Sequence, residues 1–353
     1  MTLLNPPSPA IPAPAPAAPR SAPSAARAAK LAWPAVTPLV TGVGGAAGQS
    51  VLKALRTAGL RVVAADCDDR SAALGLGDAS GLLPRADDPA YGDAVLALAL
   101  AHGADVVVCT VAEEMPALHA AAERLGAAGV TLWLPAPEAI ADCVDKVRFA
   151  ARLRAAAVPA PATAHLTDPA DISRLTETVP GPWIVKPRFG RGSRDVYACD
   201  DPGELAWAVR RVADPLVQTR VGGREFTVDA LVDREGRFAG GVPRWRSEVK
   251  AGISTKGETF ADERVLHGTA AVLAAVGLRG VACVQGFVTE ADELVFIEAN
   301  PRFSGGLPLS LAAGADLVGQ YLRAAVGLPV LPESLAYRPG VRMSRYFSEV
   351  FTG

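Results

Sequence analysis

Short apolar runs alternate with longer alanine-rich stretches over the first third of the chain. The apolar runs predict β-strands at residues 39–41, 61–65, 106–110 and 130–134. The alanine-rich stretches predict helices at about 46–58, 89–102 and 114–126. Strands that alternate with helices in this way pair in parallel through crossover connections, so we expect an α/β domain built on a parallel sheet.

The pattern changes in the second half of the chain. A helical connection over about 135–158 ends at the closely spaced Pro159 and Pro161. An apolar strand at 183–186, a glycine-rich turn and a strand at 194–198 then predict a hairpin. Further strands are expected at 216–219, 226–232, 281–288 and 294–298, and the last two are joined by a short turn. This half is therefore expected to be α+β.

These patterns divide the chain into three parts. Residues 1–35 are dominated by Ala, Pro and Ser and contain no acidic residue, so we expect a disordered tail. A first domain is predicted at 36–140 and a second at 141–353, with subdomains at 141–215 and 216–353. No internal repeat is visible.

Composition and charge exclude several function classes. The net charge of −2 gives no positive field for a nucleic-acid backbone, so no nucleic-acid partner is expected. No apolar run approaches the roughly 20 residues that span a bilayer, so no membrane partner is expected and a cytoplasmic location is favoured. The five scattered cysteines contain no C-x-x-C pair, and neither a disulfide framework nor a zinc site is indicated.

Lysine is rare in this chain, which has only six lysines, so each can be considered individually. Lys186 ends an apolar strand and precedes a loop that runs through Gly190, Arg191, Gly192 and Ser193. Backbone N–H groups of such a loop can approach a polyphosphate, and an adjacent lysine can neutralise the phosphate charge. An exposed turn with a surface lysine is the alternative interpretation.

A second polar cluster follows the apolar strand at 294–298. Glu298 and Asn300 lie two residues apart on an extended chain, so both can offer oxygen ligands to Mg²⁺ on the same side. Gln285 on the neighbouring strand can complete this set, and Arg302 can hold a transferring phosphoryl group or an oxyanion. A simple Glu298–Arg302 pair at a strand end is the alternative.

Gly305 and Gly306 precede a predicted helix start at Leu307–Pro308. A helix N-terminus reached through two glycines can bind an anion such as a substrate carboxylate. An ordinary joint between a loop and a helix is equally compatible with the sequence.

Taken in this order, the motifs over residues 39–348 resemble the ATP-grasp superfamily, in particular carbamoyl-phosphate synthetase large-subunit halves and related carboxylate-amine ligases. The resemblance implies that 36–140 is a Rossmann-like (pre-ATP-grasp) domain and that 141–353 is the ATP-grasp domain. The matching positions are Asp145-Lys146, Ile184 to Pro187 with the loop after it, Leu216 to Gln218, Gly223 to Glu225, and the set Gln285, Glu298, Asn300 and Arg302.

The resemblance also implies roles for individual residues and cofactors. ATP with Mg²⁺ (or Mn²⁺) would be the cofactors. The residues implied to bind ATP are Lys146, Lys186, Gly190, Arg191, Gly192, Ser193, Gln218, Val221 and Glu225. Gln285, Glu298 and Asn300 would bind the metal, and Arg302 with Lys186 would act in catalysis. Many relatives have a glutamate where this chain has Gln218.

A stand-alone ligase is implied rather than carbamoyl-phosphate synthesis, because the chain has one ATP unit. Such an enzyme would join a small carboxylate, by analogy an amino acid, to an amine through an acyl phosphate, and dimers occur among its relatives. Substrate contacts are implied for Glu114, Arg246, Lys250, Lys256, Gly305 and Gly306.

Two other functions compete with this hypothesis. Gly42, Gly44 and Gly45 follow a strand and open a helix, and Asp66 ends the next strand, which is the spacing of a dinucleotide-binding motif. An NAD(P)-dependent oxidoreductase is therefore the first alternative, although it leaves Lys186 and Arg302 unexplained. A non-catalytic ATP-binding module is the second alternative.

Overall fold

The computed structural model of this chain describes residues 33–166, 168, 171–190, 192, 194–250, 252–346 and 348–351. Its internal contacts separate Met1–Ala32 from Trp33–Gly353, and the description below concerns the second unit. The tail expected at 1–35 lies outside the described residues except for its last three positions.

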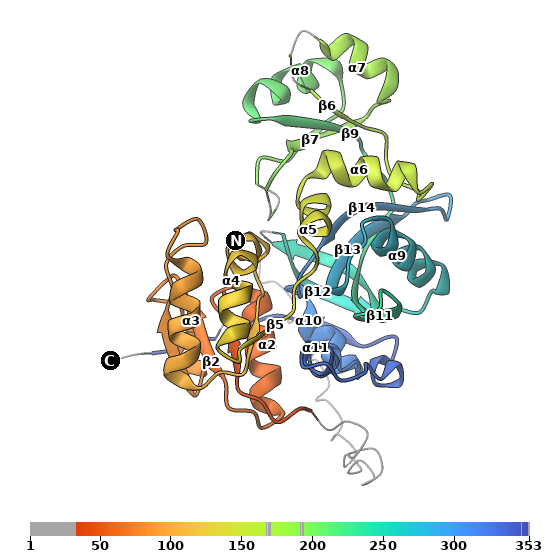
Figure 1. Cartoon of the computed structure of the whole chain (residues 1–353). Coiled ribbons are helices and arrows are strands. Elements are labelled where there is room, and N and C mark those ends of the chain that lie inside the picture. Colours follow the sequence, from red (N-terminus) through yellow and green to blue (C-terminus); the bar gives the residue numbers. More distant parts are fainter. Residues whose placement is uncertain are drawn as a thin grey trace, which may run out of the picture. The chain divides into compact units, whose positions relative to one another are not determined.

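A five-stranded parallel sheet forms the first part of this unit (Figure 1). Its strands lie in the order β3-β2-β1-β4-β5, with bounds β1 Pro38–Val40, β2 Val63–Asp66, β3 Ala79–Leu82, β4 Val106–Val108 and β5 Thr131–Leu132. The helices between them are α2 Ala46–Thr57, α3 Tyr91–His102 and α4 Met115–Ala127. The expected parallel sheet is confirmed, and β3 is an additional strand that the sequence pattern did not predict.

The two faces of this sheet are covered by different helices. Val40 and Ala64 belong to one core with side chains of α2, whereas Leu39 and Val63 belong to another core with side chains of α3 and α4. Successive residues of a strand point to opposite faces, which explains why these short strands are apolar throughout. Full burial of a side chain such as Leu52 on α2 contributes about 2 kcal/mol.

A four-stranded antiparallel sheet follows, in the order β6-β9-β7-β8. Its elements are β6 Thr163–His165, β7 Trp183–Pro187, β8 Tyr197–Cys199 and β9 Pro215–Thr219, with α7 Ile172–Thr178 and α8 Pro202–Arg211. The expected hairpin of β7 and β8 is present, but β8 is shorter than predicted. Because β9 pairs with β7, we propose that the boundary between the two subdomains follows Thr219 rather than preceding it.

A six-stranded sheet forms the last part, in the order β14-β13-β10-β11-β12-β15. Its strands are β10 Arg224–Val232, β11 Phe238–Lys250, β12 Ile253–Thr259, β13 Gly280–Val288, β14 Leu294–Asn300 and β15 Arg342–Ser344. The neighbouring strands β14, β13, β10 and β11 pair in antiparallel register, as expected for an α+β unit.

Helices cover this sheet and connect it to the rest of the unit. The elements are α5 Pro137–Val144, α6 Lys146–Ala155, α9 Glu263–Ala275, α10 Leu307–Ala313 and α11 Leu317–Ala325. Cys143 of α5 and Phe149 of α6 share a core with Phe226 and Phe296 of the sheet, so the expected helical connection packs on this sheet. No helix of the described residues is long and apolar enough to cross a membrane.

Candidate active site

A chain of hydrogen bonds links the polar residues at the end of β14. The side-chain amide of Asn300 donates to Glu298 Oε1 at 2.6 Å, and Arg302 donates to Asn300 Oδ1 at 3.2 Å. A second Arg302 nitrogen donates to the backbone carbonyl of Phe303 at 2.9 Å. Asn300 therefore lies between the carboxylate and the guanidinium, and the direct Glu298–Arg302 pair considered above is replaced by this bridge.

Gln285 lies on β13 directly opposite Glu298. The register shifts between Gln285 and Gly286, so an irregularity in the sheet occurs next to these two side chains. Bulges of this kind redirect side chains near functional sites. The expected set of Gln285, Glu298 and Asn300 is thus brought together by one strand pair.

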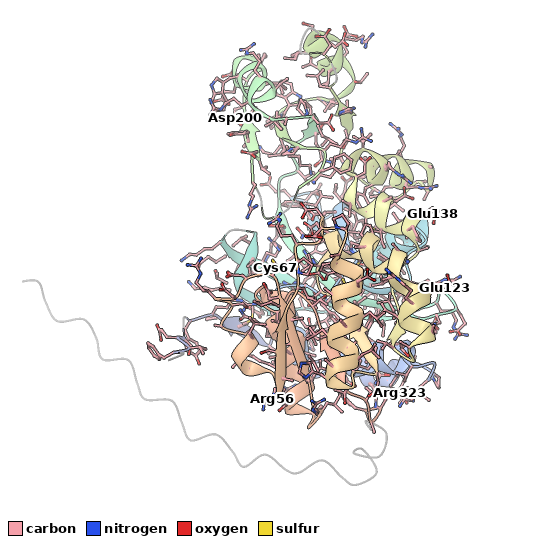
Figure 2. The ribbon with its side chains drawn as sticks, turned by 60° about the vertical axis from the view of Figure 1, so that its left-hand side comes forward. Arg56, Cys67, Glu123, Glu138, Asp200 and Arg323 are labelled. Atoms are coloured by element: carbon pink, nitrogen blue, oxygen red, sulfur yellow. The ribbon has the colours of Figure 1, made fainter. Side chains whose placement is uncertain are left out.

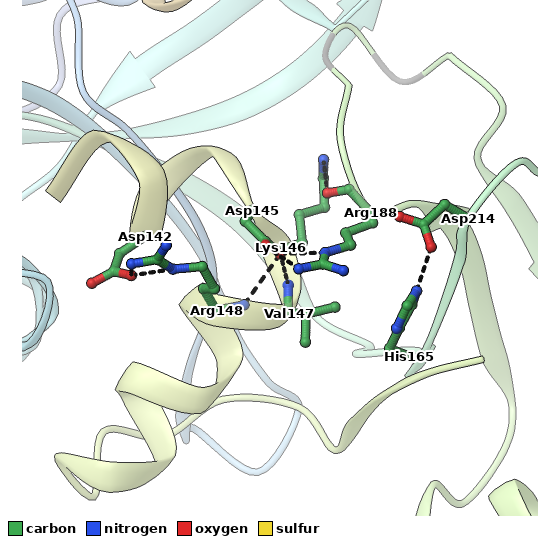
Figure 3. A network of polar contacts seen from close by, with 8 residues as sticks. All are labelled: Asp142, Asp145, Lys146, Val147, Arg148, His165, Arg188 and Asp214. Carbon is green, nitrogen blue, oxygen red and sulfur yellow. Dashed lines mark hydrogen bonds and ion pairs between the residues drawn. The ribbon is translucent and has the colours of Figure 1, made fainter. Parts of the chain in front are cut away.

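Lys146 begins α6, and its position depends on the aspartate before it (Figure 3). Asp145 caps the helix by accepting hydrogen bonds from the backbone N–H groups of Val147 and Arg148. Arg188 donates two hydrogen bonds to the same carboxylate, at 2.9 and 2.5 Å, and these partners hold the pKa of Asp145 below its usual value despite the opposing effect of burial. The glycine-rich loop is thereby tied to the start of α6.

The ammonium group of Lys146 bonds the loop backbone. It donates to the carbonyl of Gly190 at 3.0 Å and to that of Arg188 at 3.4 Å. Burial lowers the pKa of Lys146, and the Glu298 carboxylate opposes this effect. Lys146 thus links the loop to the carboxylate of β14 electrostatically.

Lys186 is buried on β7 and donates a hydrogen bond of 3.0 Å to Gln218 Oε1 on β9. Gln218 in turn donates to the Thr163 hydroxyl at 2.8 Å. Burial lowers the pKa of Lys186 to about 8, against the attraction of Glu298. A glutamine at this position satisfies the buried lysine without adding a negative charge.

Most of these residues line a cleft of about 400 Å³ between the two antiparallel sheets, whereas Asn300 and Arg302 line a neighbouring cavity of about 530 Å³ that also reaches Lys146 and Glu298. Of the residues expected to bind ATP or metal, the cleft is lined by Lys146, Lys186, Gly190, Gly192, Gln218, Val221, Glu225, Gln285 and Glu298. Arg191 and Ser193 lie outside the described residues. Glu225 was expected to bind the ribose and Arg246 the substrate. Glu225 Oε1 lies 2.8 Å from Arg246 Nε, so these two residues form an ion pair between β10 and β11.

The residues present fit Mg²⁺ only in part. Carboxylate and amide oxygens are the ligands that Mg²⁺ accepts, but Glu298 is the one carboxylate of the set. The described residues contain no group of three or more His, Cys, Asp or Glu side chains placed to hold a metal. Such a set suits a Mg²⁺ ion whose remaining ligands are phosphate oxygens of the nucleotide, rather than an ion bound by protein ligands alone.

A neighbouring cavity of about 300 Å³ reveals a residue that the sequence analysis missed. Arg244 lines it together with Arg246 and Arg302, and its side chain is only 2% exposed. Arg244 is held by Asp229 at 3.1 and 3.2 Å and by the Ser304 hydroxyl at 3.0 Å. An arginine within a strand that carries a second arginine, Arg246, and Lys250 gives no sequence signal of burial.

Gly305 and Gly306 line the same cavity, and the anion site expected at the following helix stays a prediction. The helix α10 is only seven residues long, and the Gly306 N–H already donates to the Ser304 hydroxyl at 3.1 Å. A Cβ atom on Gly306 would lie 2.3 Å from Arg244 Cζ. The glycine is therefore required by the close approach of the arginine.

Two substrate candidates are placed elsewhere. Lys250 and Lys256 both pair with Glu248, at 3.8 and 2.8 Å, and both side chains are largely exposed. Neither lines the cleft or the cavities described here. In the described residues both lysines pair with Glu248 at the surface, and their substrate role stays a prediction.

An N–H group of the glycine turn in the first domain is already bonded to a carboxylate. The N–H of Gly44 donates to Asp66 Oδ2 at 2.6 Å. An acidic residue at the end of the second strand is itself part of the dinucleotide motif, so Asp66 does not decide against a dinucleotide. The NAD(P) alternative is disfavoured because it leaves Lys186 and Arg302 unexplained.

Glu114, the remaining candidate, is buried at the start of α4 and accepts a hydrogen bond of 2.5 Å from the Thr41 hydroxyl. Burial raises its pKa to about 7. It lines a cavity of about 670 Å³ together with the glycine turn and Cys67, which is labelled in Figure 2.

Two family models match parts of the chain. Residues 39–133 match the family described as "PylC-like, N-terminal domain", and residues 211–347 match "ATP-grasp in the biosynthetic pathway with Ter operon". The carbamoyl phosphate synthase large chain of Beutenbergia cavernae is 31% identical over 252 residues, which cover 61% of this chain and 22% of that protein. The chain thus spans about a fifth of the length of this relative.

Solved structures show the same fold at low sequence identity. The biotin carboxylase domain of Hydrogenobacter thermophilus 2-oxoglutarate carboxylase, in complex with MgADP, gives a TM-score of 0.70 at 18% identity over 86% of this chain and 73% of that one. The L-amino acid ligase of Bacillus licheniformis gives 0.68 at 18% identity over 86% and 77%. The expected resemblance is confirmed: this chain has the ATP-grasp fold, its residues 39–133 match the PylC-like N-terminal domain family, and it is similar in sequence to carbamoyl phosphate synthase large chains.

Proposed function

We propose that this chain is an ATP-dependent ligase that joins a small carboxylate to an amine through an acyl phosphate. The observation that carries the proposal is the cleft in which two buried or half-buried lysines face Glu298 and Gln285. Solved structures with this fold include an L-amino acid ligase, a biotin carboxylase in a complex with β,γ-ATP and a biotin carboxylase domain bound to MgADP. The structures with this fold support the binding of ATP, whereas the fold does not identify the carboxylate substrate.

In the first step a carboxylate oxygen attacks the γ-phosphorus of ATP, and the bond from that phosphorus to ADP breaks. Lys146 and Lys186 are proposed to bind phosphate oxygens, and the glycine-rich loop is proposed to exclude water. Gln285, Glu298 and Asn300 would hold Mg²⁺, which supplies charge neutralisation when bound. Gln218 and Val221 are proposed to contact adenine, and Glu225 the ribose.

In the second step the amine nitrogen forms a bond to the acyl carbon, and the carbon–oxygen bond to phosphate breaks. Starting from an ammonium group, one proton leaves with the phosphate and one passes to solvent. Arg302 is proposed to stabilise the oxyanion, because Asn300 and the Phe303 carbonyl hold its guanidinium in place.

The first half-reaction can be tested without knowing the amine. The purified chain would be incubated with Mg-ATP, hydroxylamine and pooled carboxylates, and ADP and hydroxamate would be measured together. We expect both products in the wild type and neither in Lys186→Met, which removes a charge at similar volume. Lys53→Met makes the same change at an exposed position of α2 and should match the wild type.

Binding of ATP without either product in the wild type would favour the non-catalytic module instead. Binding of NADH without ATP binding would refute the ligase proposal. The homodimer expected from relatives stays a prediction, which sedimentation of the full chain would test.

A further inference from the structure

The cavity of the first domain contains polar groups that the first half-reaction does not use. It has a volume of about 670 Å³, within the range of sites for small molecules. Two buried carboxylates, Asp66 and Glu114, line it at the ends of β2 and of the loop before α4. Among the described residues, no cationic side chain forms an ion pair with either of them.

Two hydroxyl groups line the same cavity. Tyr91 is 1% exposed, and its hydroxyl lies beside the Thr41 hydroxyl and the Glu114 carboxylate. The hydroxyl of Ser71 is buried and has no hydrogen-bond partner among the described residues. Buried hydroxyl groups nearly always have a partner, so the Ser71 hydroxyl is free to bind a polar group of a ligand.

The glycine turn packs closely against the residues around Glu114. Gly42 has a φ of +65°, and a Cβ atom there would lie 2.3 Å from the side chain of Val111. A glycine is therefore required by the backbone conformation and by the close approach of Val111. The Thr41 hydroxyl occupies one oxygen of Glu114, which positions the carboxylate.

The acceptors in this cavity determine what it can bind. Arg85, which pairs with Asp87, and Arg194 also line the cavity, and Asp66 accepts hydrogen bonds from the backbone N–H groups of Gly44 and Asp68. The buried carboxylate of Glu114 has no cationic partner among the described residues and favours a ligand group that brings N–H donors and a positive charge. Burial and the nearby Asp66 both disfavour the charged form of Glu114, and a bound cation would remove this penalty. An anionic ligand would increase it.

We propose that this cavity binds the ammonium group of the second substrate, with Glu114 and Tyr91 as its partners, so that the nucleophile of the ligase is an amino acid or another primary amine. Pro187, Gly190 and Arg194 line both this cavity and the nucleotide cleft, which places the amine next to the acyl phosphate. This inference rests on the proposed ligase function for its chemistry but not for binding.

Direct binding can therefore be measured without turnover. The full chain would be titrated calorimetrically with putrescine and with a mixture of the twenty amino acids, and then with the same compounds after N-acetylation. We expect binding of at least one amine and none of its acetylated form. Glu114→Gln and Tyr91→Phe, which preserve side-chain volume, should each weaken binding at least tenfold.

Asp69→Asn is the matched control, because it removes one carboxylate that is 74% exposed and does not line the cavity. It should bind amines as the wild type does. Near-ultraviolet circular dichroism would verify that all three variants are folded. Equal binding by wild type, Glu114→Gln and Tyr91→Phe would overturn the inference, as would equal binding of acetylated compounds or no amine binding by the wild type.

The two proposals can fail separately. Amine binding that Glu114→Gln abolishes, in a protein that releases no ADP, would support this site and refute the ligase. Hydroxamate formation that persists in Glu114→Gln while transfer to the amine is lost would support both.

Discussion

The stability of this protein should depend on pH through Glu114. In the folded chain burial raises the pKa of this carboxyl from 4.5 to about 7. Between these values the folded state therefore binds a proton that the unfolded state releases. The stabilisation is fully present below pH 4.5 and is lost as pH rises through about 7.

The size of this effect follows from the two pKa values. The full difference corresponds to about 3 kcal/mol, and about 2–3 kcal/mol of it falls between pH 5 and pH 8. Glu114→Gln keeps the size of the side chain and an oxygen that accepts the hydrogen bond from the Thr41 hydroxyl, but the amide does not titrate in this pH range. The difference in unfolding free energy between wild type and Glu114→Gln should therefore change by that amount over this range, with the wild type losing stability.

Urea unfolding at pH 5, 6, 7 and 8 would measure this difference directly. Other groups, such as Asp316, whose pKa burial raises to about 6, titrate equally in both proteins and cancel. A difference that is constant from pH 5 to pH 8 would refute the assignment of a buried, proton-binding Glu114. Asp316→Asn provides a comparison at a site outside the proposed amine cavity.

Three further predictions concern the nucleotide cleft and the cavity beside it. Asp229→Asn leaves Arg244 charged and buried, so urea unfolding should show a loss of about 3–5 kcal/mol, whereas replacing both by apolar residues of similar volume should cost much less. Gly306→Ala forces a Cβ atom against the Arg244 guanidinium and should cost about 1–3 kcal/mol, while Gly126→Ala, in an open helical position, should be neutral or stabilising by calorimetric melting. Because the pKa of Lys186 is about 8, ATP affinity should fall from pH 7.5 to pH 9, and Lys186→Met should show a flat profile in the same titration.

The parallel sheet was predictable because its strands are apolar on both faces and its helices are alanine-rich. In contrast, β11 and β12 were missed, because Gly240, Gly241 and Pro243 interrupt any alternation in β11. The burial of Arg244 in this strand depends on Asp229, Ser304 and Ser310, which come from other elements. Such a network appears only when distant segments meet.

The candidate site shows the same division. The Glu298-Ala299-Asn300 spacing predicted a shared side of β14, because two residues apart on a strand is a local property. The pairing of Lys186 with Gln218 and of Glu225 with Arg246 depends on strand register, which the sequence does not specify. Substrate contacts of Lys250 and Lys256 are implied by the resemblance alone, and their pairing with Glu248 depends on the register of β11 and β12.

The contact between Lys146 and the Gly190 carbonyl has a consequence for nucleotide entry. Lys146 uses two of its three ammonium N–H donors for the carbonyls of Gly190 and Arg188, so a phosphate oxygen can accept from the third while the loop stays bonded. The Arg188–Asp145 contact at the base of the loop does not involve this ammonium group. One lysine could then bond the loop backbone and a phosphate at the same time.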